Sequence, residues 1–198
     1  ESVSGQILFV PNPGLKPEYT YNADFGVSYT DGEYIKLEAN GFYTWFQNAI
    51  VASAFTLNGS DSVMYDGKMT QVVANQNKAR AYLYGFNAAI TLKLVPHVTF
   101  YSTFNYTYGR YENAGAEAPM DHIPPVFGKT SLMYRHKRFE GEAFVMYNGW
   151  KHLQDYSPSG EDNLNYATTK GMPSWVTLNA RVGYRFTENM GVQVALEN

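Results

Sequence analysis

Residues 19–30 read YTYNADFGVSYT, a strict alternation of aromatic or apolar residues with polar or small ones. A period of two puts successive side chains on opposite faces of a β-strand. The pair Asp31-Gly32 follows, and because both residues tolerate positive φ it predicts a two-residue hairpin turn. The return stretch 35–45 repeats the alternation, with one face carrying Ile35, Leu37, Ala39, Gly41, Tyr43 and Trp45.

The same alternation recurs along the chain and predicts eight strands, most of about ten residues or more, a length that spans a bilayer when tilted. Four connections are tight and lie near Asp31, Pro96, His136 and Asn189. Three are long, at 49–72, 109–125 and 150–173. Short turns on one rim and long loops on the other are typical of membrane barrels. The expected fold class is all-β, a transmembrane antiparallel β-barrel segment of about eight long strands.

The alternation also predicts which side chains share a face. We expect lipid contact for Val27, Leu37, Ala88, Ile90, Val145 and Val182. We expect a lumen position for Asp24, Glu38, Asn87, Thr103 and Arg181. A bulge, which would shift the phase, is most plausible near Gly85 or Gly141.

Aromatic residues of the outward phase gather near both ends of the strands. At the long-loop ends they are Tyr19, Tyr21, Tyr43, Trp45, Tyr82, Tyr84, Tyr106, Tyr108, Tyr147 and Trp175. At the tight-turn ends they are Tyr29, Phe100, Tyr134, Phe139, Tyr184 and Phe186. Two aromatic belts around an aliphatic band are how a barrel meets two headgroup layers.

Composition excludes several classes of protein. The chain has 198 residues, 44% hydrophobic, with no cysteine and a formal net charge of −3. Disulfides and thiolate metal sites are therefore excluded, and no basic footprint for nucleic acid is present. A mean hydropathy of −0.36 fits a barrel whose polar and apolar faces average out. The chain contains no apolar run of about 18 residues, so no transmembrane helix is predicted. No signal peptide is visible, so we expect a mature or truncated chain.

Three stretches resemble segments of one known family. They are NPGLKPE at 12–18, HIPPVFG at 122–128 and ALEN at 195–198. In this order and spacing they resemble the late barrel strands of TonB-dependent receptors of the bacterial outer membrane. The resemblance implies a barrel of about twenty-two strands around a plug, with energised import of siderophore-iron, haem, cobalamin or a glycan. It implies that residues 1–198 are part of one barrel domain, with the plug and the final strand absent from this chain.

The implied partners are outer-membrane lipid, the remaining strands and plug of the same receptor, the TonB complex acting through the plug, and a small-molecule or glycan ligand. Charges of the inward phase cannot face lipid cheaply. The candidates for lumen or plug contact are Asp24, Glu38, Lys129, Arg181 and Arg185. The plainer interpretation is a polar lumen held by cross-strand ion pairs among all the charges of this phase, which also include Lys36, Lys93, Arg135, Glu140 and Glu142.

The long loops carry the candidate ligand-binding residues. Trp150, Tyr156 and Tyr166 either stack on a ligand or sugar or anchor the rim. His122 and His152 are candidates for haem or metal capture, or are ordinary loop residues. The tight-turn residues His97 and His136 are expected to be solvated. We find no metal-ligand spacing, no cofactor motif and no nucleophile–base pair, so we predict that the protein is not an enzyme.

Two other interpretations stay open on the sequence alone. One is a self-contained eight-stranded outer-membrane barrel that acts as an anchor, adhesin or small pore. The other is a soluble antiparallel sandwich, although its strands would be about half as long. Pairing of the first long strand with the last would favour the small barrel, and two open edges would favour part of a larger receptor.

Overall fold

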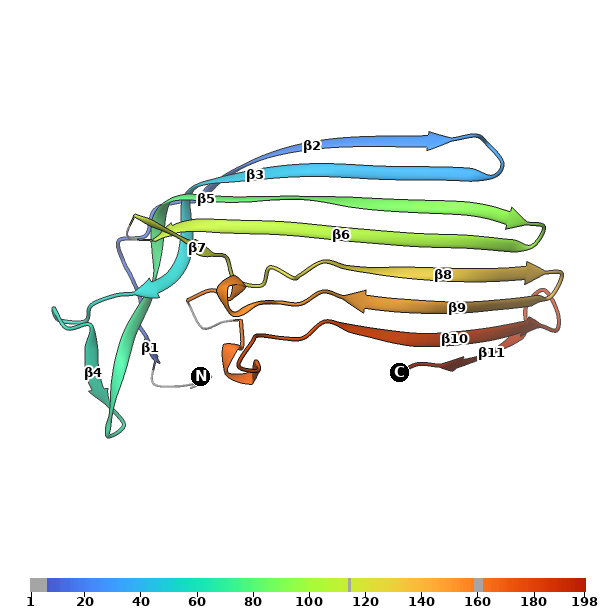
Figure 1. Cartoon of the computed structure of the whole chain (residues 1–198). Helices are drawn as coiled ribbons and strands as arrows, with labels where there is room; N and C mark the ends of the chain where they lie inside the picture. The colour runs from blue at the N-terminus through green and yellow to red at the C-terminus, as the bar shows by residue number, and fades with distance from the viewer. Residues whose placement is uncertain (1–6, 114, 159–161) are drawn as a thin grey trace.

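The computed structural model of the chain describes residues 7–113, 115–158 and 162–198. These residues form one 11-stranded sheet, in which eight strands follow one another in the order β11-β10-β9-β8-β6-β5-β3-β2 (Figure 1). Every neighbouring pair along this path is antiparallel. The eight strands match the predicted ones and are β2 (Tyr19–Thr30), β3 (Ile35–Ala54), β5 (Lys68–Val95), β6 (Val98–Asn113), β8 (Phe127–His136), β9 (Phe139–Asn148), β10 (Trp175–Arg185) and β11 (Gly191–Leu196).

Three short strands extend the sheet: β1 (Ile7–Phe9), β4 (Ser62–Tyr65) and β7 (Ala116–Pro119). They pair with the extended ends of β5 and β6, so the prediction of plain loops at 49–72 and 109–125 is wrong in part. The alternation fails at the start of β5 because three consecutive residues are buried there, and both faces of the strand are covered. Val72 and Ala74 belong to a small core with Val10 and the partly buried Phe55, and Val73 between them is buried as well.

The connections separate to opposite ends of the sheet. Figure 1 shows the turns β2–β3, β5–β6, β8–β9 and β10–β11 at one end and β4, β7 and the long connections at the other. The alternation of connection lengths predicted this arrangement, and it is confirmed. The turn at Pro96-His97 has two residues between the paired Val95 and Val98.

The turn after β2 is longer than the predicted two residues, because β3 begins only at Ile35. The Asp31 carboxylate accepts backbone N–H groups from Ile35 at 2.9 Å, Glu33 at 2.9 Å and Tyr34 at 2.7 Å. These hydrogen bonds favour the ionised form, so they hold the pKa of Asp31 below its ordinary value. One side chain thus replaces the backbone partners that a tighter turn would supply.

The register confirms the predicted division of side chains between two faces. Val27 pairs with Ala39, and Ala39 with Ala88, across β2, β3 and β5. All six residues predicted to contact lipid lie on this face, which we call the apolar face. The five predicted lumen residues lie on the opposite, polar face. The register shift lies between Lys93 and Val95, not near Gly85 or Gly141, and therefore leaves the phase of the strands intact.

Both edges of the eight-strand path are open. β2 is hydrogen-bonded to β3 and β11 to β10, and no ladder joins β2 to β11 among the described residues. All twelve residues of β2 and all six of β11 are exposed. Figure 1 shows the two strands on opposite sides of the sheet. The sheet therefore does not close on itself as the self-contained eight-stranded barrel requires.

The segment 12–18 lies against the extended part of β5. Asn77 acts as a side-chain substitute for a strand partner: its amide oxygen accepts the Lys16 N–H at 2.7 Å and its amide nitrogen donates to the Lys16 carbonyl at 2.9 Å. The Asn12 amide donates to the Asn75 carbonyl at 2.9 Å, and Glu18 accepts the N–H of Ile50 at 2.6 Å. This segment therefore fixes the chain entering β2 to the long-loop end of the sheet.

Two short 3-10 helices, η1 (Leu153–Asp155) and η2 (Leu164–Tyr166), are the helical turns among the described residues. None of the described helices has the length and apolarity needed to cross a bilayer.

Candidate functional site: the polar face and the long-loop end

The centre of the polar face carries a charge cluster across three strands. Glu142 on β9 accepts Lys129 Nζ from β8 at 2.6 Å and lies 2.5 Å from an Arg181 guanidinium nitrogen on β10. Glu142 is buried, with 7% of its surface exposed. Lys129 Nζ also lies 4.1 Å from the centre of the Phe144 ring. Two cations therefore hold one buried carboxylate, which is the cross-strand ion pairing that the inward charges predicted.

The other predicted polar-face charges lie apart from this cluster. Asp24 accepts a hydrogen bond from its neighbour Asn22. Glu38 pairs with Lys36 at 2.9 Å, and both side chains are exposed. Arg185 lies at the tight-turn end, where its backbone N–H donates to the Arg138 carbonyl. Of the five predicted residues the structure thus brings Lys129 and Arg181 together.

At the long-loop end, Asp162 holds two loops together. Its carboxylate accepts the backbone N–H of His122 at 2.7 Å, the N–H of Ser157 at 3.1 Å and Lys151 Nζ at 2.9 Å. The Asp162 side chain is 3% exposed. Burial raises the pKa of this carboxyl, but the three donors outweigh burial and hold the pKa below its ordinary value. Lys151 also donates to the Ile123 carbonyl at 3.1 Å.

The predicted loop residues divide between packing and exposure. Tyr156 is 8% exposed and lies under Lys151, whose Nζ is 4.9 Å from the ring centre. Trp150 stacks on His152 with ring centres 5.8 Å apart, and its indole N–H donates to the Lys170 carbonyl. Tyr166 on η2 is 79% exposed. Tyr156 is therefore a packing residue, while Trp150, His152 and Tyr166 offer rings at the surface.

Sequence reasoning did not predict the role of Asp162 or Lys151. The donors to Asp162 come from positions 5, 11 and 40 residues away, so no local motif marks this carboxylate. Aromatic residues mark these loops in the sequence, whereas the contacts that hold the loops together are made by the charged Asp162 and Lys151.

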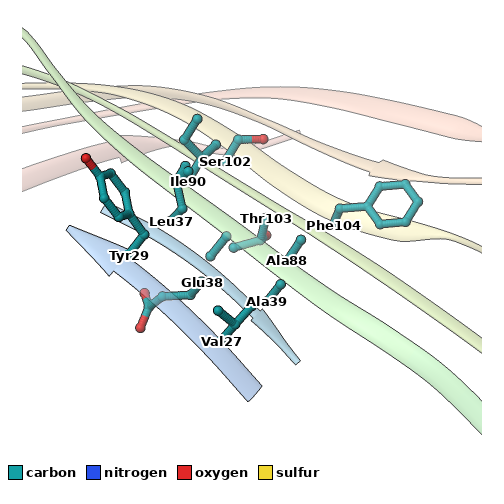
Figure 2. A pocket seen from close by; sticks show the side chains of 11 residues that line it. Val27, Tyr29, Leu37, Glu38, Ala39, Ala88, Ile90, Ser102, Thr103 and Phe104 are labelled. Atoms are coloured by element: carbon teal, nitrogen blue, oxygen red, sulfur yellow. The ribbon is translucent and has the colours of Figure 1, made fainter. Parts of the chain in front are cut away.

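The apolar face has a shallow hollow of about 500 Å³ in its aliphatic band. Figure 2 shows Val27, Ala39 and Ala88 on neighbouring strands, with the larger Leu37 and Ile90 beside them. The short alanine side chains leave this hollow between larger neighbours. Most of its lining is aliphatic or aromatic; Ser102 is a polar residue of this face, and Glu38 and Thr103 of the polar face also border the hollow.

Aromatic rings gather in contact on the apolar face toward the long loops. Tyr82 stacks on Tyr43 and Tyr84, and Tyr84 contacts Tyr108, as the predicted outer belt requires. Trp175 is an exception. It precedes Val176 of the apolar face, and because adjacent residues of a strand point to opposite faces, Trp175 belongs to the polar face. Its predicted outward position is wrong.

Comparisons with known proteins agree on one family. The family model described as "TonB dependent receptor-like, beta-barrel" matches residues 2–198. A curated relative, the iron-regulated outer membrane virulence protein of Vibrio cholerae serotype O1, is 23% identical over 99% of the chain and 29% of its own length. The chain thus spans under a third of the curated relatives that it matches.

Solved structures of large barrels share the fold. The copper transporter OprC has a TM-score of 0.73 at 17% identity, over 94% of this chain and 26% of that one. The ferric enterobactin receptor PfeA of Pseudomonas aeruginosa, a Q482A mutant in complex with enterobactin, has a TM-score of 0.70 at 16% identity, over 97% and 27%. The yersiniabactin uptake receptor FyuA of Yersinia pestis has a TM-score of 0.58 at 17% identity, over 91% and 24%. At these identities the likeness shows the fold alone.

Four observations lead to one assignment: the length of the strands, the division into two faces, the separation of turns from loops, and a family match over nearly every residue. The chain belongs to the TonB-dependent receptor-like β-barrel family and is a protein of the bacterial outer membrane.

Proposed function

We propose that the chain forms part of the barrel wall of a TonB-dependent receptor that imports a scarce nutrient: siderophore-iron, haem, cobalamin or a glycan. The family match over residues 2–198 is the observation that carries this proposal. Among these nutrients we favour a ferric siderophore, because a relative that matches 99% of the chain is named as an iron-regulated outer membrane protein. The protein is then a transporter rather than an enzyme.

In this proposal both open edges continue into further strands of the same barrel, the final strand included. Unpaired backbone N–H and C=O groups cost several kcal/mol each in hydrocarbon, so β2 and β11 need hydrogen-bonding partners. The apolar face then contacts lipid, and the polar face lines the lumen around a plug. Asp24, Glu38 and Arg185, which lie outside the central charge cluster, are the candidates for contact with the plug, and the plug couples the receptor to the TonB complex.

The exposed rings at the long-loop end are the proposed ligand contacts. The Trp150–His152 stack and Tyr166 present flat apolar surfaces beside loops that Asp162 holds in place. Aromatic faces of this kind suit the aryl or sugar groups of a nutrient. His122 lies on the same rim and extends the candidate surface.

The experiment is nutrient uptake by a strain that lacks the full receptor and is complemented with it. Growth under iron limitation is measured with ferric siderophores and haem, while cobalamin and oligosaccharides are supplied to strains that depend on them. We expect the receptor to restore the use of ferric siderophores, and the restoration to vanish when TonB is deleted. Restored growth on another nutrient alone would overturn the preference for siderophores. Growth restored without TonB would overturn the proposed function.

The rings are tested in the same strain. Trp150→Ala should raise the ligand concentration needed for half-maximal uptake and leave the amount of receptor in the membrane unchanged. Leu153→Ala, an exposed loop position on η1, serves as the control. Unchanged uptake by Trp150→Ala would remove the stack from the ligand surface.

A further inference from the structure

Two histidines meet at the tight-turn end of the sheet, far from the long loops. His97 lies in the β5–β6 turn and His136 at the end of β8. His136 Nδ1 lies 3.0 Å from His97 Nε2, and the ring centres are 4.2 Å apart. One ring nitrogen donates and the other accepts, so the accepting nitrogen presents a lone pair.

The backbone under the two rings is fixed by the sheet. Val98, next to His97, pairs with Tyr134, and the N–H of Arg135 donates to the His97 carbonyl at 2.8 Å. His136 itself pairs with Phe139. His97 has a φ of 74°, a left-handed conformation that favours glycine or asparagine. The two imidazoles therefore project from neighbouring, hydrogen-bonded positions whose separation the strands set.

We propose that His97 and His136 form a two-imidazole site for a divalent transition-metal ion, Zn²⁺ or Cu²⁺. Imidazole nitrogens bind zinc at about 2.0–2.1 Å, so two of them on one ion lie about 2.9–3.4 Å apart. The observed 3.0 Å falls in this range. Rotation of the exposed His97 ring and the half-buried His136 ring about their side-chain bonds turns both lone pairs onto one ion, in place of the proton that the rings share.

The charges around the pair select the kind of ion. Glu140 already pairs with Arg135 at 3.5 Å, and Lys137 and Arg138 follow His136 in the turn. No group of three or more His, Cys, Asp or Glu suited to a metal exists among the described residues. The pair thus offers nitrogen ligands without a carboxylate, which suits zinc and copper and excludes the oxygen-preferring Ca²⁺ and Mg²⁺. Water completes the coordination.

The test uses the full receptor in detergent. Zn²⁺ bound per receptor and its affinity are measured by calorimetry for the wild type, His97→Gln and His136→Gln, with Mg²⁺ as a second ion. We expect each variant to lose one bound Zn²⁺ or to weaken that site about tenfold or more, and Mg²⁺ to give no saturable binding. Lys137→Gln, which changes the residue after His136 in the same turn, is the matched control and should keep the site.

A second measurement needs no variant. In the wild-type receptor, Zn²⁺ should slow the modification of both His97 and His136 by diethyl pyrocarbonate, as measured by peptide mass spectrometry. Equal Zn²⁺ binding in all variants, or protection of neither histidine, would overturn the proposal. An effect of one histidine alone would overturn it too, because the site is defined by the pair.

Discussion

On β5, Ala88 and Ala89 are neighbours in sequence but have different surroundings. Ala88 pairs with Ala39 and Phe104 on the apolar face, whereas Ala89 pairs with Glu38 and Thr103 on the polar face. The same contrast repeats along the sheet: the apolar face offers aliphatic side chains bordered by aromatic rings, and the polar face carries the Glu142 cluster. Adjacent residues of one strand thus have different environments, and the loss of unfolding free energy caused by a substitution depends on the face to which the side chain points.

The sharpest test of this comparison places the same charge on each of the two alanines. Ala88→Arg should destabilise the receptor by about 2–4 kcal/mol, the cost of an arginine on the lipid face near the bilayer midplane. Ala89→Arg lies beside Glu38 and should cost about 1 kcal/mol or less. The measurement is urea unfolding of the full receptor in lipid vesicles. Equal losses for the two variants would end the distinction between the faces.

A second pair of variants compares how tightly the faces are packed. Gly41 pairs with Phe86 on the apolar face, and Gly85 pairs with Phe42 on the polar face. A Cβ at Gly85 would come within 2.6 Å of the Phe42 ring and overlap the Tyr106 carbonyl, whereas at Gly41 the nearest atom is 3.9 Å away. Gly85→Ala should therefore cost about 1–3 kcal/mol and Gly41→Ala less than about 1 kcal/mol. A costlier Gly41→Ala in the same unfolding assay would contradict this order.

The charge cluster itself supplies a third test. Glu142→Gln leaves Lys129 and Arg181 without their shared anion and should cost about 1–2 kcal/mol, below the figure for a fully buried pair because both cations are partly exposed. Glu140→Gln, on the same strand and face, breaks a longer and more exposed pair with Arg135 and should change the unfolding free energy by about 0.5 kcal/mol. If the two variants lose the same unfolding free energy, the burial of Glu142 does not strengthen its ion pairs.

The smallest effect on the whole barrel is expected at Asp162, which belongs to neither face. Asp162→Asn should leave the unfolding midpoint nearly unchanged but speed tryptic cleavage at the exposed Lys170 by about fivefold. Asp155→Asn, which breaks a 3.7 Å contact with Arg110, is the matched control and should change cleavage little. Cleavage that stays slow in Asp162→Asn would show that the two loops hold together without this carboxylate.

The same carboxylate predicts a pH dependence. The pKa of Asp162 in the folded protein is below its ordinary value. The stability that this carboxylate gives to the two loops is therefore fully present above the ordinary aspartate pKa, and it is lost as the pH falls through the folded pKa. Loop protection should therefore be constant from neutral pH to about pH 5 and decline only in stronger acid. The measurement is cleavage by proteinase K from neutral to acid pH, normalised at each pH to cleavage of an unstructured peptide; loss of protection already near pH 6 would contradict the prediction.

The regular part of the wall was predictable because period two is a local property. Val27 and Glu38 fall on the expected faces, since the ladders that contain them have no bulge. The extension around Val72 and Ala74 was not predictable from alternation, because both faces of that strand are covered. Trp175 lies on the polar face because its position next to Val176 in the strand, and not the tendency of tryptophan to lie in an aromatic belt, decides its face.

The sites were harder to predict than the wall. The rings of Trp150 and Tyr166 are visible in the sequence, but the contacts that hold the loops come from residues far apart in the chain. His97 and His136 are 39 positions apart, and each reads as an ordinary turn residue. Only the register of β6 against β8 brings the two together.

The open meander also bears on how such a wall assembles. Along the eight-strand path each long strand pairs with the next long strand in the chain. Each new strand therefore joins the sheet by closing only the connection to the strand before it. Short closures cost little chain entropy and form fast. In the proposed receptor the slow step then lies at the seam that joins the first and last strands of the completed barrel. Until that seam forms, β2 and β11 are open edges to which further strands can pair, and the wall gains one hairpin at each step.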